Sequence, residues 1–534
     1  MALYPLRETL KKELKKGVDV LVIGGGINGA GIVRDSALRG LRVGLVEKND
    51  FASGTSSRSS KLIHGGLRYL EHLDFPLVYE SGRERALLTA LHPQLVKNTP
   101  FLFPVYRTDR FNIHFMDLGL WLYDALALFR NHGLHRKLRV PETLKREPAL
   151  NTDGLTGALM YNDCRVNDAE LVRQNVVSGL CHGAYPVNYM EALSLTPRNG
   201  RIDSVRVCDR LTGEEFDIPC RALVCAGGPW SNALYERLEG KKRSLLRLTK
   251  GIHLVVPNAK LPVQDAVVVN SNEDKRIIFI IPWDGWTLVG TTDTDYHEDL
   301  DSVLADKEDV RSLLALVNRL FPGYHLKTSD AVSVFAGLRP LVLSGGSAST
   351  VSRQDKIFQG PSGAYYIGGG KLTTYRNMAE KMVDRLLHGP LKDLKIQVRP
   401  CVTRRTPFVE TPLSGNVSMD ALNVHLNTRY GTQAAKIHNM IQNDALLARP
   451  AVPGLPFILA EIVYAARYEL LANLTDFMRL RTDIFLKAPD NGRAAADLCA
   501  RLLGKVLEWD ETEIQIQIKA YGGFVEDQLH CLKP

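Results

Sequence analysis

A short apolar run followed by spaced glycines, close to the amino terminus, constrains the fold of this chain more than any other feature. Residues 18–23 (VDVLVI) form the run, and Gly24, Gly26 and Gly29 follow it in the spacing G-x-G-x-x-G. Such a run predicts a buried parallel strand. The first glycine permits a tight turn, the second lets a pyrophosphate approach the backbone, and the third lets a helix pack closely on the strand. The pattern therefore predicts a dinucleotide-binding βαβ unit.

The residues that follow complete this unit. A helical stretch from about Asn28 to Arg39 stops at Gly40, and a second apolar strand (RVGLV) ends at Glu47. The start of the helix offers free N–H groups and a positive dipole end to a phosphate, and we predict that Asn28 is among the cofactor-binding residues. An acid about 20 residues after the glycines accepts hydrogen bonds from the adenosine ribose. Glu47 in that place also disfavours a 2′-phosphate, and therefore NADP.

Two further glycine-containing segments favour FAD over NAD. The segment ALVCAGGPW (222–230) is similar to the internal strand and turn of FAD enzymes of this type, and YYIGGGKLTTYRNMAE (365–380) is similar to their C-terminal return. These elements recur over about 350 residues, whereas a simple NAD domain needs only about 150. We recognise no flavin-attachment motif, so the predicted FAD is non-covalent.

The predicted fold class is α/β: a Rossmann-like FAD-binding domain interleaved with an antiparallel-sheet α+β substrate domain, followed by a C-terminal helical domain. Strand-like segments separated by turn residues indicate the antiparallel sheet; they lie at 203–208, 222–226, 252–257, 276–281 and 286–290. Within residues 1–388 we assign about 18–70, 155–235 and 335–388 to the discontinuous FAD-binding domain. The substrate domain then covers about 71–154 and 236–334. Residues 389–534 form the helical domain, with 457–487 as its clearest helix.

Composition excludes several classes of protein. The formal charge of +8, from 67 basic and 59 acidic residues, fits an anionic substrate or an anionic membrane surface. Nucleic acid is not predicted, because that would need a denser basic stripe. Eight cysteines without a Cys-x-x-Cys pair predict no metal site and a reduced, cytoplasmic environment. We find neither a signal peptide nor a run of about 18 apolar residues, so the protein is expected to be soluble or to sit on a membrane face.

Two segments are candidates for membrane contact. Leu6, Leu10 and Leu14 recur every fourth residue among four lysines, which describes a short basic amphipathic helix. MDLGLWLYDALALF (116–129) is more apolar and contains aromatic residues. Two interpretations remain open for both segments: ordinary packing onto the body of the protein, or contact with an anionic bilayer.

Several long strings resemble motifs of the aerobic, FAD-dependent glycerol-3-phosphate dehydrogenases. They are GGGINGAG, GTSSRSSKLIHGGLRYLE, CAGGPWS, TKGIHLVV, LVGTTDTDY, GLRPL and GGGKLTTYR, and the C-terminal EIVYAARYELLANLTDFMRLRTDIF adds to them. The resemblance runs from about residue 15 to 490 and departs at Tyr468, where histidine is expected. It implies oxidation of sn-glycerol 3-phosphate to dihydroxyacetone phosphate, with electrons passed to a membrane quinone. It also implies a peripheral location on the cytoplasmic face of the inner membrane, and the chain is a possible homodimer.

The same resemblance implies roles for single residues. Arg339 and Lys371, with Arg68, Arg353 and Tyr69, would bind the substrate phosphate, because guanidinium groups can contact phosphate through two hydrogen bonds. Lys371 could instead open a helix whose N-terminus faces the flavin pyrimidine, and Thr373 and Thr374 could cap that helix or bind FAD. Further cofactor contacts are predicted for Lys48, Thr55, Ser56, Ser57, His64, Gly65, Gly66, Gly370 and Thr373.

Oxidation of a C–OH group needs a base for the hydroxyl proton, and histidine suits this near neutral pH. Two histidines are candidates: His253, on a probable strand (GIHLVV), and His64, in the loop expected near the flavin. By resemblance His253 is the favoured catalytic base, together with Arg339 as a catalytic residue, and His64 faces the flavin. Alternatives to the dehydrogenase are an oxidase that returns electrons to oxygen, an amino-acid oxidase, and a flavin-binding, membrane-associated protein without turnover.

Overall fold

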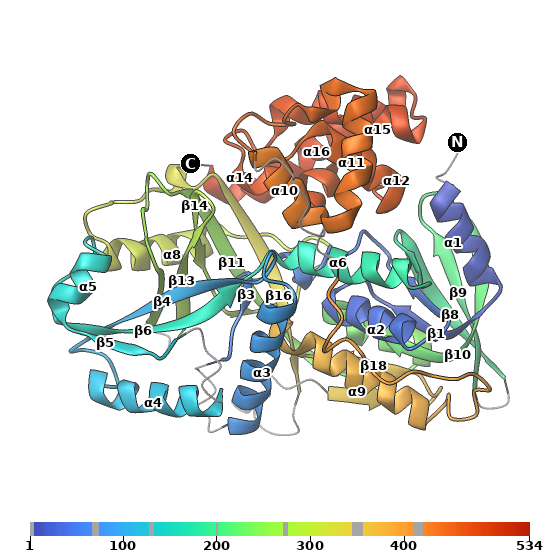
Figure 1. The fold of residues 1–534 in the computed structure, drawn as a ribbon, viewed down its shortest axis with the longest axis horizontal. Helices are drawn as coiled ribbons and strands as arrows, with labels where there is room; N and C mark the ends of the chain where they lie inside the picture. Colours follow the sequence, from blue (N-terminus) through green and yellow to red (C-terminus); the bar gives the residue numbers. More distant parts are fainter. Residues whose placement is uncertain are drawn as a thin grey trace.

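A computed structural model describes residues 5–66, 74–127, 133–198, 201–270, 276–343, 356–408 and 420–533. Two β-sheets lie next to each other along the longest axis of the molecule, and a helical domain lies across one side of both (Figure 1). Each sheet is built from segments that are far apart in the sequence. The predicted α/β class with a C-terminal helical domain is confirmed.

The first sheet has the strand order β17-β18-β10-β1-β2-β7, and its central pairs, from β18 to β7, are parallel. These strands are β1 (Val18–Ile23), β2 (Val43–Val46), β7 (Tyr185–Val187), β10 (Glu215–Cys225), β17 (Lys356–Gln359) and β18 (Tyr365–Gly368). Two antiparallel strands, β8 (Met190–Arg198) and β9 (Arg201–Asp209), extend β10. Helices α2 (Ile27–Leu38), α6 (Asp168–Cys181) and α9 (Tyr375–His388) accompany this sheet, and α2 packs against the other two.

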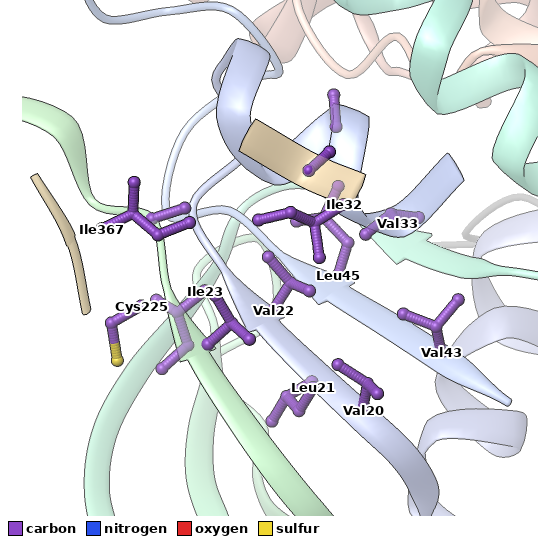
Figure 2. Close-up of a cluster of buried hydrophobic side chains, with 14 of the residues drawn as sticks. Val20, Leu21, Val22, Ile23, Ile32, Val33, Val43, Leu45, Cys225 and Ile367 are labelled. Carbon is purple, nitrogen blue, oxygen red and sulfur yellow. The ribbon is translucent and has the colours of Figure 1, made fainter. Parts of the chain in front are cut away.

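Apolar side chains between α2 and the strands form the core of this part. Figure 2 shows Ile32 and Val33 of α2 close to side chains from β1, β2, β10 and β18. Val20, Leu21 and Val22 of β1 are completely buried. The near-continuous apolar run is therefore explained by burial on both faces of a parallel strand.

The fingerprint glycines make this close packing possible. Gly24 has φ +109°, and a Cβ there would lie 2.4 Å from the carbonyl oxygen of Ala226 on the neighbouring segment. A Cβ on Gly29 would lie 1.9 Å from the carbonyl oxygen of Gly24. A side chain at Gly24 would displace the segment after β10, and one at Gly29 would push α2 away from β1. The predicted βαβ unit is confirmed, as are the tight turn at Gly24 and the close packing at Gly29, whereas the approach of a pyrophosphate to Gly26 stays a prediction.

The second sheet has the order β15-β11-β14-β13-β12-β4-β6-β3, with β16 on β11 and β5 on β6. All of its pairs are antiparallel except β12 with β4. The strands are β3 (Leu62–Ile63), β4 (Lys97–Tyr106), β5 (Arg136–Leu138), β6 (Leu155–Arg165), β11 (Leu246–Pro257), β12 (Ala266–Asn270), β13 (Ile277–Trp283), β14 (Trp286–Gly290), β15 (Thr294–Asp295) and β16 (Ser333–Val342). Its helices are α3 (Phe75–Leu91), α4 (Ile113–Leu126), α5 (Val140–Arg146) and α8 (Lys307–Leu320), while α7 (Ser231–Glu239) follows β10.

Two details differ from the sequence-based assignment. The strands predicted at 203–208 and 222–226 belong to the first sheet, because β10 pairs with β1 and β9 pairs with β10. Conversely, β6 and β16 lie in segments assigned to the FAD-binding domain but pair in the second sheet. Alternation of apolar and polar residues does not reveal which sheet a strand joins. The domain boundaries themselves stay a prediction.

The C-terminal domain is helical, but the expected helix at 457–487 is broken. It divides into α12 (Leu459–Tyr468), α13 (Leu474–Asp476), a π-helical turn (Phe477–Arg481) and α14 (Ile484–Lys487). Leu470 has φ +57° after α12, and the side chain of Asn473 caps the start of α13. The other helices of the domain are α10 (Ala421–Tyr430), α11 (Ala434–Asn443), α15 (Ala496–Leu507) and α16 (Glu511–Leu529).

Helix α1 (Pro5–Lys15) packs onto the first sheet, beside β7 and β10. Its Leu10 and Leu14 are buried. Lys11 is also buried, with its Nζ 2.8 Å from carboxylate oxygens of both Asp209 and Glu214. For α1, ordinary packing is therefore the correct interpretation of the leucine spacing, and this apolar face cannot enter a bilayer.

Candidate active site

The loop between β1 and α2 forms a cradle for a nucleotide. Gly26 is the N-cap residue of α2 and provides no side-chain cap, and the N–H of Ile27 donates to Ser56 Oγ at 3.0 Å. Glu47, at the end of β2, accepts hydrogen bonds from the N–H groups of Gly25 (2.6 Å) and Asn49 (2.9 Å). Burial raises the pKa of the Glu47 carboxyl, although the two N–H donors oppose this shift.

The glycine-rich turn after β18 meets this cradle. The amide of Asn28, in the first turn of α2, donates to the carbonyl of Gly369 at 3.4 Å. Gly369 and Gly370 have φ of +69° and +90°, which side chains rarely adopt. Thr373 Oγ1 accepts from the N–H of His64 and donates to its carbonyl, both at 3.1 Å. The turn therefore joins the fingerprint to the loop that contains His64.

The expected capping role of Thr373 and Thr374 is wrong. A 3₁₀ turn (Leu372–Thr374) precedes α9, and neither its N-cap residue, Lys371, nor Thr374 at the start of α9 makes a side-chain capping bond. The Thr373 hydroxyl is occupied by His64 instead. The sequence pattern could not show this, because the partner lies about 300 residues away.

The remaining residues predicted to contact the cofactor lie around the loop that follows β2. Thr55 donates to the carbonyl of Leu338 at 2.7 Å, and Ser57 donates to that of Gly54 at 3.4 Å, so both hydroxyls hold the loop. Lys48 pairs with Asp301 at 2.6 Å. The N–H of Gly65 donates to Asp163 at 3.1 Å. Their contacts with the cofactor stay predictions.

A cavity of about 980 Å³ lies beside this loop. The second sheet and the turn after β18 both contribute to its lining, which includes the predicted residues Thr55, His64, Gly66, His253, Arg339, Gly370, Lys371 and Thr373. Arg68, Tyr69 and Arg353 lie outside the described residues, so their predicted contact with the substrate phosphate stays a prediction. The structure thus brings together His253, Arg339 and Lys371 from distant parts of the sequence.

His253 lies on β11, between β14 and β16, where Gly290 and Phe335 are its cross-strand neighbours. Its Nε2 is 2.9 Å from Ser60 Oγ, and its ring stacks on Phe335. Burial, and after it the charges of Arg339 and Lys61, hold the pKa of His253 well below the ordinary value of 6.5. The imidazole is therefore neutral at neutral pH, which is the form that can accept a proton.

Arg339 projects from β16 and is held by three acceptors. Its guanidinium donates to Asp293 Oδ1 (2.9 Å), Thr291 Oγ1 (2.7 Å) and the carbonyl of Thr292 (3.0 Å). Lys371 Nζ donates to Ser81 Oγ at 2.9 Å. Two cations that line one cavity, fixed largely by neutral oxygens, can attract an anion.

Two further residues of this region were not identified from the sequence. Arg58 lines the cavity and donates to the carbonyl of Ala336 at 3.2 Å, and Ser60 contacts His253. Burial, together with the nearby charge of Arg479, holds the pKa of Arg58 well below its ordinary value. Their position within the glycine- and serine-rich loop was the signal that could have identified them.

The cavity lining contains a polar and an apolar group of side chains. The polar group, called the polar end below, includes Arg58, Ser60, His64, His253, Arg339 and Lys371. The apolar group, called the apolar end below, includes Phe101, Phe103, Phe111, Phe115, Met116, Leu118, Leu120, Trp121, Leu122, Leu159, Tyr161, Val268, Ile277 and Phe279, although Asp163, Asn270 and Arg276 also line the cavity from or beside the same strands. Helix α4 supplies much of the apolar end, and its Leu118 and Trp121 are 66% and 48% exposed.

These groups fit FAD. The uncapped start of α2 and the glycine cradle suit a pyrophosphate, and the half-buried Glu47 carboxylate suits a ribose. Gly369 and Gly370 line the cavity, so the backbone of this turn would lie beside a flavin ring bound there. Bound at this place, FAD would supply an acceptor for a hydride from carbon.

Comparisons with known proteins agree with this geometry. Residues 19–385 match the family of FAD-dependent oxidoreductases, and residues 366–514 match the C-terminal domain of alpha-glycerophosphate oxidase. The chain is 34% identical to the aerobic glycerol-3-phosphate dehydrogenase of Staphylococcus haemolyticus, over 96% of this chain and 95% of that one. It is 35% identical to the enzyme of the same name from Staphylococcus aureus, over 89% and 88%.

Solved structures give the same result. The crystal structure of the glycerol-3-phosphate dehydrogenase from Bacillus halodurans, complexed with FAD, superposes with a TM-score of 0.80 at 30% identity and covers 99% of this chain and 98% of that chain. The L-α-glycerophosphate oxidase from Mycoplasma pneumoniae shares the fold, with a TM-score of 0.56 at 19% identity and coverage of 72% and 97%.

Proposed function

We propose a specific reaction for this chain, which belongs to the FAD-dependent oxidoreductases and, among them, to the family of aerobic glycerol-3-phosphate dehydrogenases. It oxidises sn-glycerol 3-phosphate at C2 to dihydroxyacetone phosphate and passes two electrons to a membrane quinone. The observation that supports this most is the polar end of the cavity, where Arg339, Lys371 and a neutral, buried His253 lie together beside the glycine-rich turn.

In this proposal the two cations anchor the substrate. A dianionic phosphate cannot leave water for a buried cleft unless matching positive charge awaits it. Among the described residues, Arg339 and Lys371 provide that charge. Arg68, Tyr69 and Arg353 are proposed to make further contacts with the phosphate. Because Arg339 is already fixed by Asp293, Thr291 and Thr292, little conformational entropy is lost when phosphate binds.

His253 is proposed to take the proton of the C2 hydroxyl at Nε2, the nitrogen that contacts Ser60 in this structure. Its low pKa keeps it unprotonated before the substrate arrives, but also makes it a weak base. The bound phosphate would offset the positive charge of Arg339, which is one cause of that low pKa. Substrate binding should therefore raise the proton affinity of His253 at the moment when a base is needed.

The proposal also specifies the electron acceptor and the location of the protein at the membrane. No helix within the described ranges is both long and apolar enough to cross a bilayer. Of the two sequence candidates for membrane contact, α1 has its leucines buried, whereas α4 exposes Phe115, Leu118, Trp121 and Leu122. Four exposed arginines lie shortly before and after α4 in the sequence and complement an anionic surface: Arg107, Arg110, Arg136 and Arg139. We therefore propose that the protein sits peripherally on the cytoplasmic face of the inner membrane, with α4 toward the lipid.

One experiment tests the reaction. The yellow protein is mixed anaerobically with glycerol 3-phosphate while the flavin absorbance is followed, and bleaching is expected. A short-chain quinone should then restore the colour faster than air does. Absence of bleaching would contradict the substrate assignment, and fast restoration by air alone would make the protein an oxidase. Acid precipitation should release all of the colour, because the FAD is proposed to be non-covalent.

A further inference from the structure

A loop that follows β2, residues 50–57, contacts the nucleotide cradle with its inner side. The N–H of Ala52 donates to the carbonyl of Gly25 at 3.0 Å, and Ser56 Oγ accepts from the N–H of Ile27 at 3.0 Å. Gly25 and Ile27 belong to the glycine-rich turn that would hold the pyrophosphate of FAD. The inner side of loop 50–57 is therefore joined to the part of the molecule that would hold the cofactor.

The outer side of the same loop contacts the C-terminal helical domain. Arg479, from the π-helical turn of that domain, donates to the carbonyl of Ser53 at 3.2 Å and to Ser57 Oγ at 3.4 Å. Arg481, from the same turn, donates to both carboxylate oxygens of Asp50, at 2.5 Å and 3.1 Å. Two arginines from a distant part of the chain therefore hold the loop near both of its ends.

Asp50 is the strongest of these connections. It is completely buried, and a buried carboxylate is costly unless hydrogen-bond donors surround it. Besides Arg481, the amide of Asn188 donates to Asp50 at 2.8 Å, and the same amide donates to the carbonyl of Leu470 at 2.8 Å. Asp50 follows shortly after Glu47, the predicted ribose contact. The ribose side of the cradle is therefore tied to the helical domain through one buried carboxylate.

The π-helical turn presents its two arginines from a fixed backbone. Thr482, directly after the turn, donates to the carbonyl of Phe477 from its N–H at 3.0 Å and from its Oγ1 at 2.7 Å. Phe477 and Met478 are buried in the core of the helical domain. Such turns are rare in proteins and are found frequently at functional sites. The contacts to loop 50–57 therefore come from a rigid part of the domain.

We propose that Arg479 and Arg481 are positioning residues for the cofactor, and that through them the helical domain holds loop 50–57 on the cradle and slows the release of FAD. For FAD to leave, the loop must separate from the cradle, and this movement breaks its contacts with the π-helical turn. The coupling is reciprocal, so bound FAD also strengthens the attachment of the turn. The inference concerns retention of FAD and does not depend on the proposed substrate or electron acceptor.

The first experiment measures FAD release in the full-length holoprotein. Arg479→Met removes the donors but keeps an unbranched side chain, and Arg481→Lys keeps the charge but not the two-point contact with Asp50. Ser333→Ala is the matched control, because Ser333 Oγ donates to the carbonyl of Leu486 at 2.8 Å and so connects the same domain to β16 instead.

The fluorescence of free FAD is followed after dilution of each holoprotein. Loss of a hydrogen bond from a charged donor changes an equilibrium constant by about tenfold or more, so both arginine variants should release FAD at least about tenfold faster than the wild type. The Kd for FAD should rise by a similar factor. Ser333→Ala should release FAD at the rate of the wild type.

Hydrogen exchange provides a readout that a purely structural role would not change. In Arg479→Met, the amides of loop 50–57 should exchange faster, while those of β1 and β2 keep their rates. In the wild type, removal of FAD should speed exchange in the π-helical turn, and this response should be lost in Arg479→Met. The wild-type comparison stays decisive even if Arg481→Lys does not fold.

Three outcomes would overturn the inference. Unchanged FAD release in Arg479→Met, with a lower melting temperature alone, would make the contact purely structural. An equal acceleration of release in Ser333→Ala would show that any weakening of the domain interface has this effect. Exchange in the π-helical turn that does not respond to FAD would exclude the coupling between the turn and the cofactor. All of these measurements omit the substrate, so they are independent of the outcome of the bleaching experiment.

Discussion

The two ends of the cavity are built in opposite ways. At the polar end, His253 and Arg339 project from the adjacent strands β11 and β16. Stacking on Phe335 fixes His253, and hydrogen bonds to Thr291 and to the carbonyl of Thr292 fix Arg339. At the apolar end, α4 contributes exposed apolar residues, and polar contacts of Tyr123 and Asp124 hold its buried side. A small dianion needs charges arranged in advance, whereas a lipid surface needs only exposed apolar side chains. The proposed substrate contact therefore depends on fixed side chains of the sheet, and the proposed membrane contact depends on the exposed face of one helix.

The largest expected effect comes from the proposed base at the polar end. His253→Gln should lower kcat by about 10²–10⁴-fold, because positioned general bases contribute rate factors of that order. KM should change little, since Arg339 and Lys371 remain in place. Rapid mixing should locate the loss in bleaching, with reoxidation by quinone unaffected. If bleaching keeps its rate, His64 becomes the candidate base, and His64→Gln is the next variant to measure.

Arg339→Ala should have the next largest effect, and it too should slow only the reduction of the flavin by the substrate. Loss of one partner from a buried charged contact costs about 2–5 kcal/mol, so kcat/KM for glycerol 3-phosphate should fall by about 30-fold to several thousand-fold. Arg339→Lys should recover only part of the loss, because an ammonium cannot make the bidentate contact. Glycerol, which has no phosphate, is the control substrate. Equal losses for the two substrates would mean that Arg339 supports the fold or the flavin instead.

The sequence predicts the nucleotide cradle better than either end of the cavity. The cradle is local: Gly24, Gly29 and Glu47 act within one βαβ unit, so spacing alone fixes their geometry. The polar end joins residues that are far apart in the sequence, such as Ser60 and His253 at a separation of 193 positions, and only family resemblance could connect His253 with Arg339 and Lys371. Ser60, which contacts His253, was missed because a serine in a polar loop has no periodic signal.

The two candidate membrane helices show a second limit of prediction from the sequence, which concerns the burial of an apolar face. Leucine spacing predicted an apolar face on α1, and apolar and aromatic composition singled out segment 116–129, but neither signal can show what covers an apolar face. In α1 the leucines meet β7 and β10, whereas in α4 the buried side is formed by Leu120, Tyr123 and Asp124, and several apolar residues point outward. Figure 1 places these two helices toward opposite ends of the molecule.

Glu47→Gln should affect reduction and reoxidation of the flavin equally, because it acts through the binding of FAD and not through either end of the cavity. Hydrogen bonds to a charged acceptor contribute about 1.5–3 kcal/mol, so the Kd for FAD should rise by about 10- to 100-fold, and excess FAD should restore activity. The pKa of Glu47 is raised, so its charge is lost at a higher pH than that of an exposed glutamate. FAD should therefore dissociate more readily as pH falls, beginning at a higher pH than an exposed glutamate would require, measured by fluorescence of released flavin. This pH dependence should weaken in Glu47→Gln.

The smallest effects concern lipid binding, where α4 and α1 can be compared directly. Leu118 of α4 is 66% exposed, and Leu498 of α15 is a matched exposed leucine, 48% exposed, in the C-terminal domain. Full burial of a leucine contributes about 1.5–3 kcal/mol, and about two thirds of Leu118 is available for burial, so Leu118→Asn should weaken vesicle binding by about 5- to 30-fold, and Leu498→Asn should not.

In α1 only the charged side chains are available for contact with lipid, because Leu10 and Leu14 are buried. Lys12→Gln should cost at most about 1 kcal/mol on anionic vesicles, and the difference should vanish as salt rises, whereas the Leu118 effect should persist. Sedimentation with anionic and neutral vesicles at low and high salt separates the two contributions. A larger, salt-resistant loss in Lys12→Gln than in Leu118→Asn would reverse the comparison and place α1, not α4, at the bilayer.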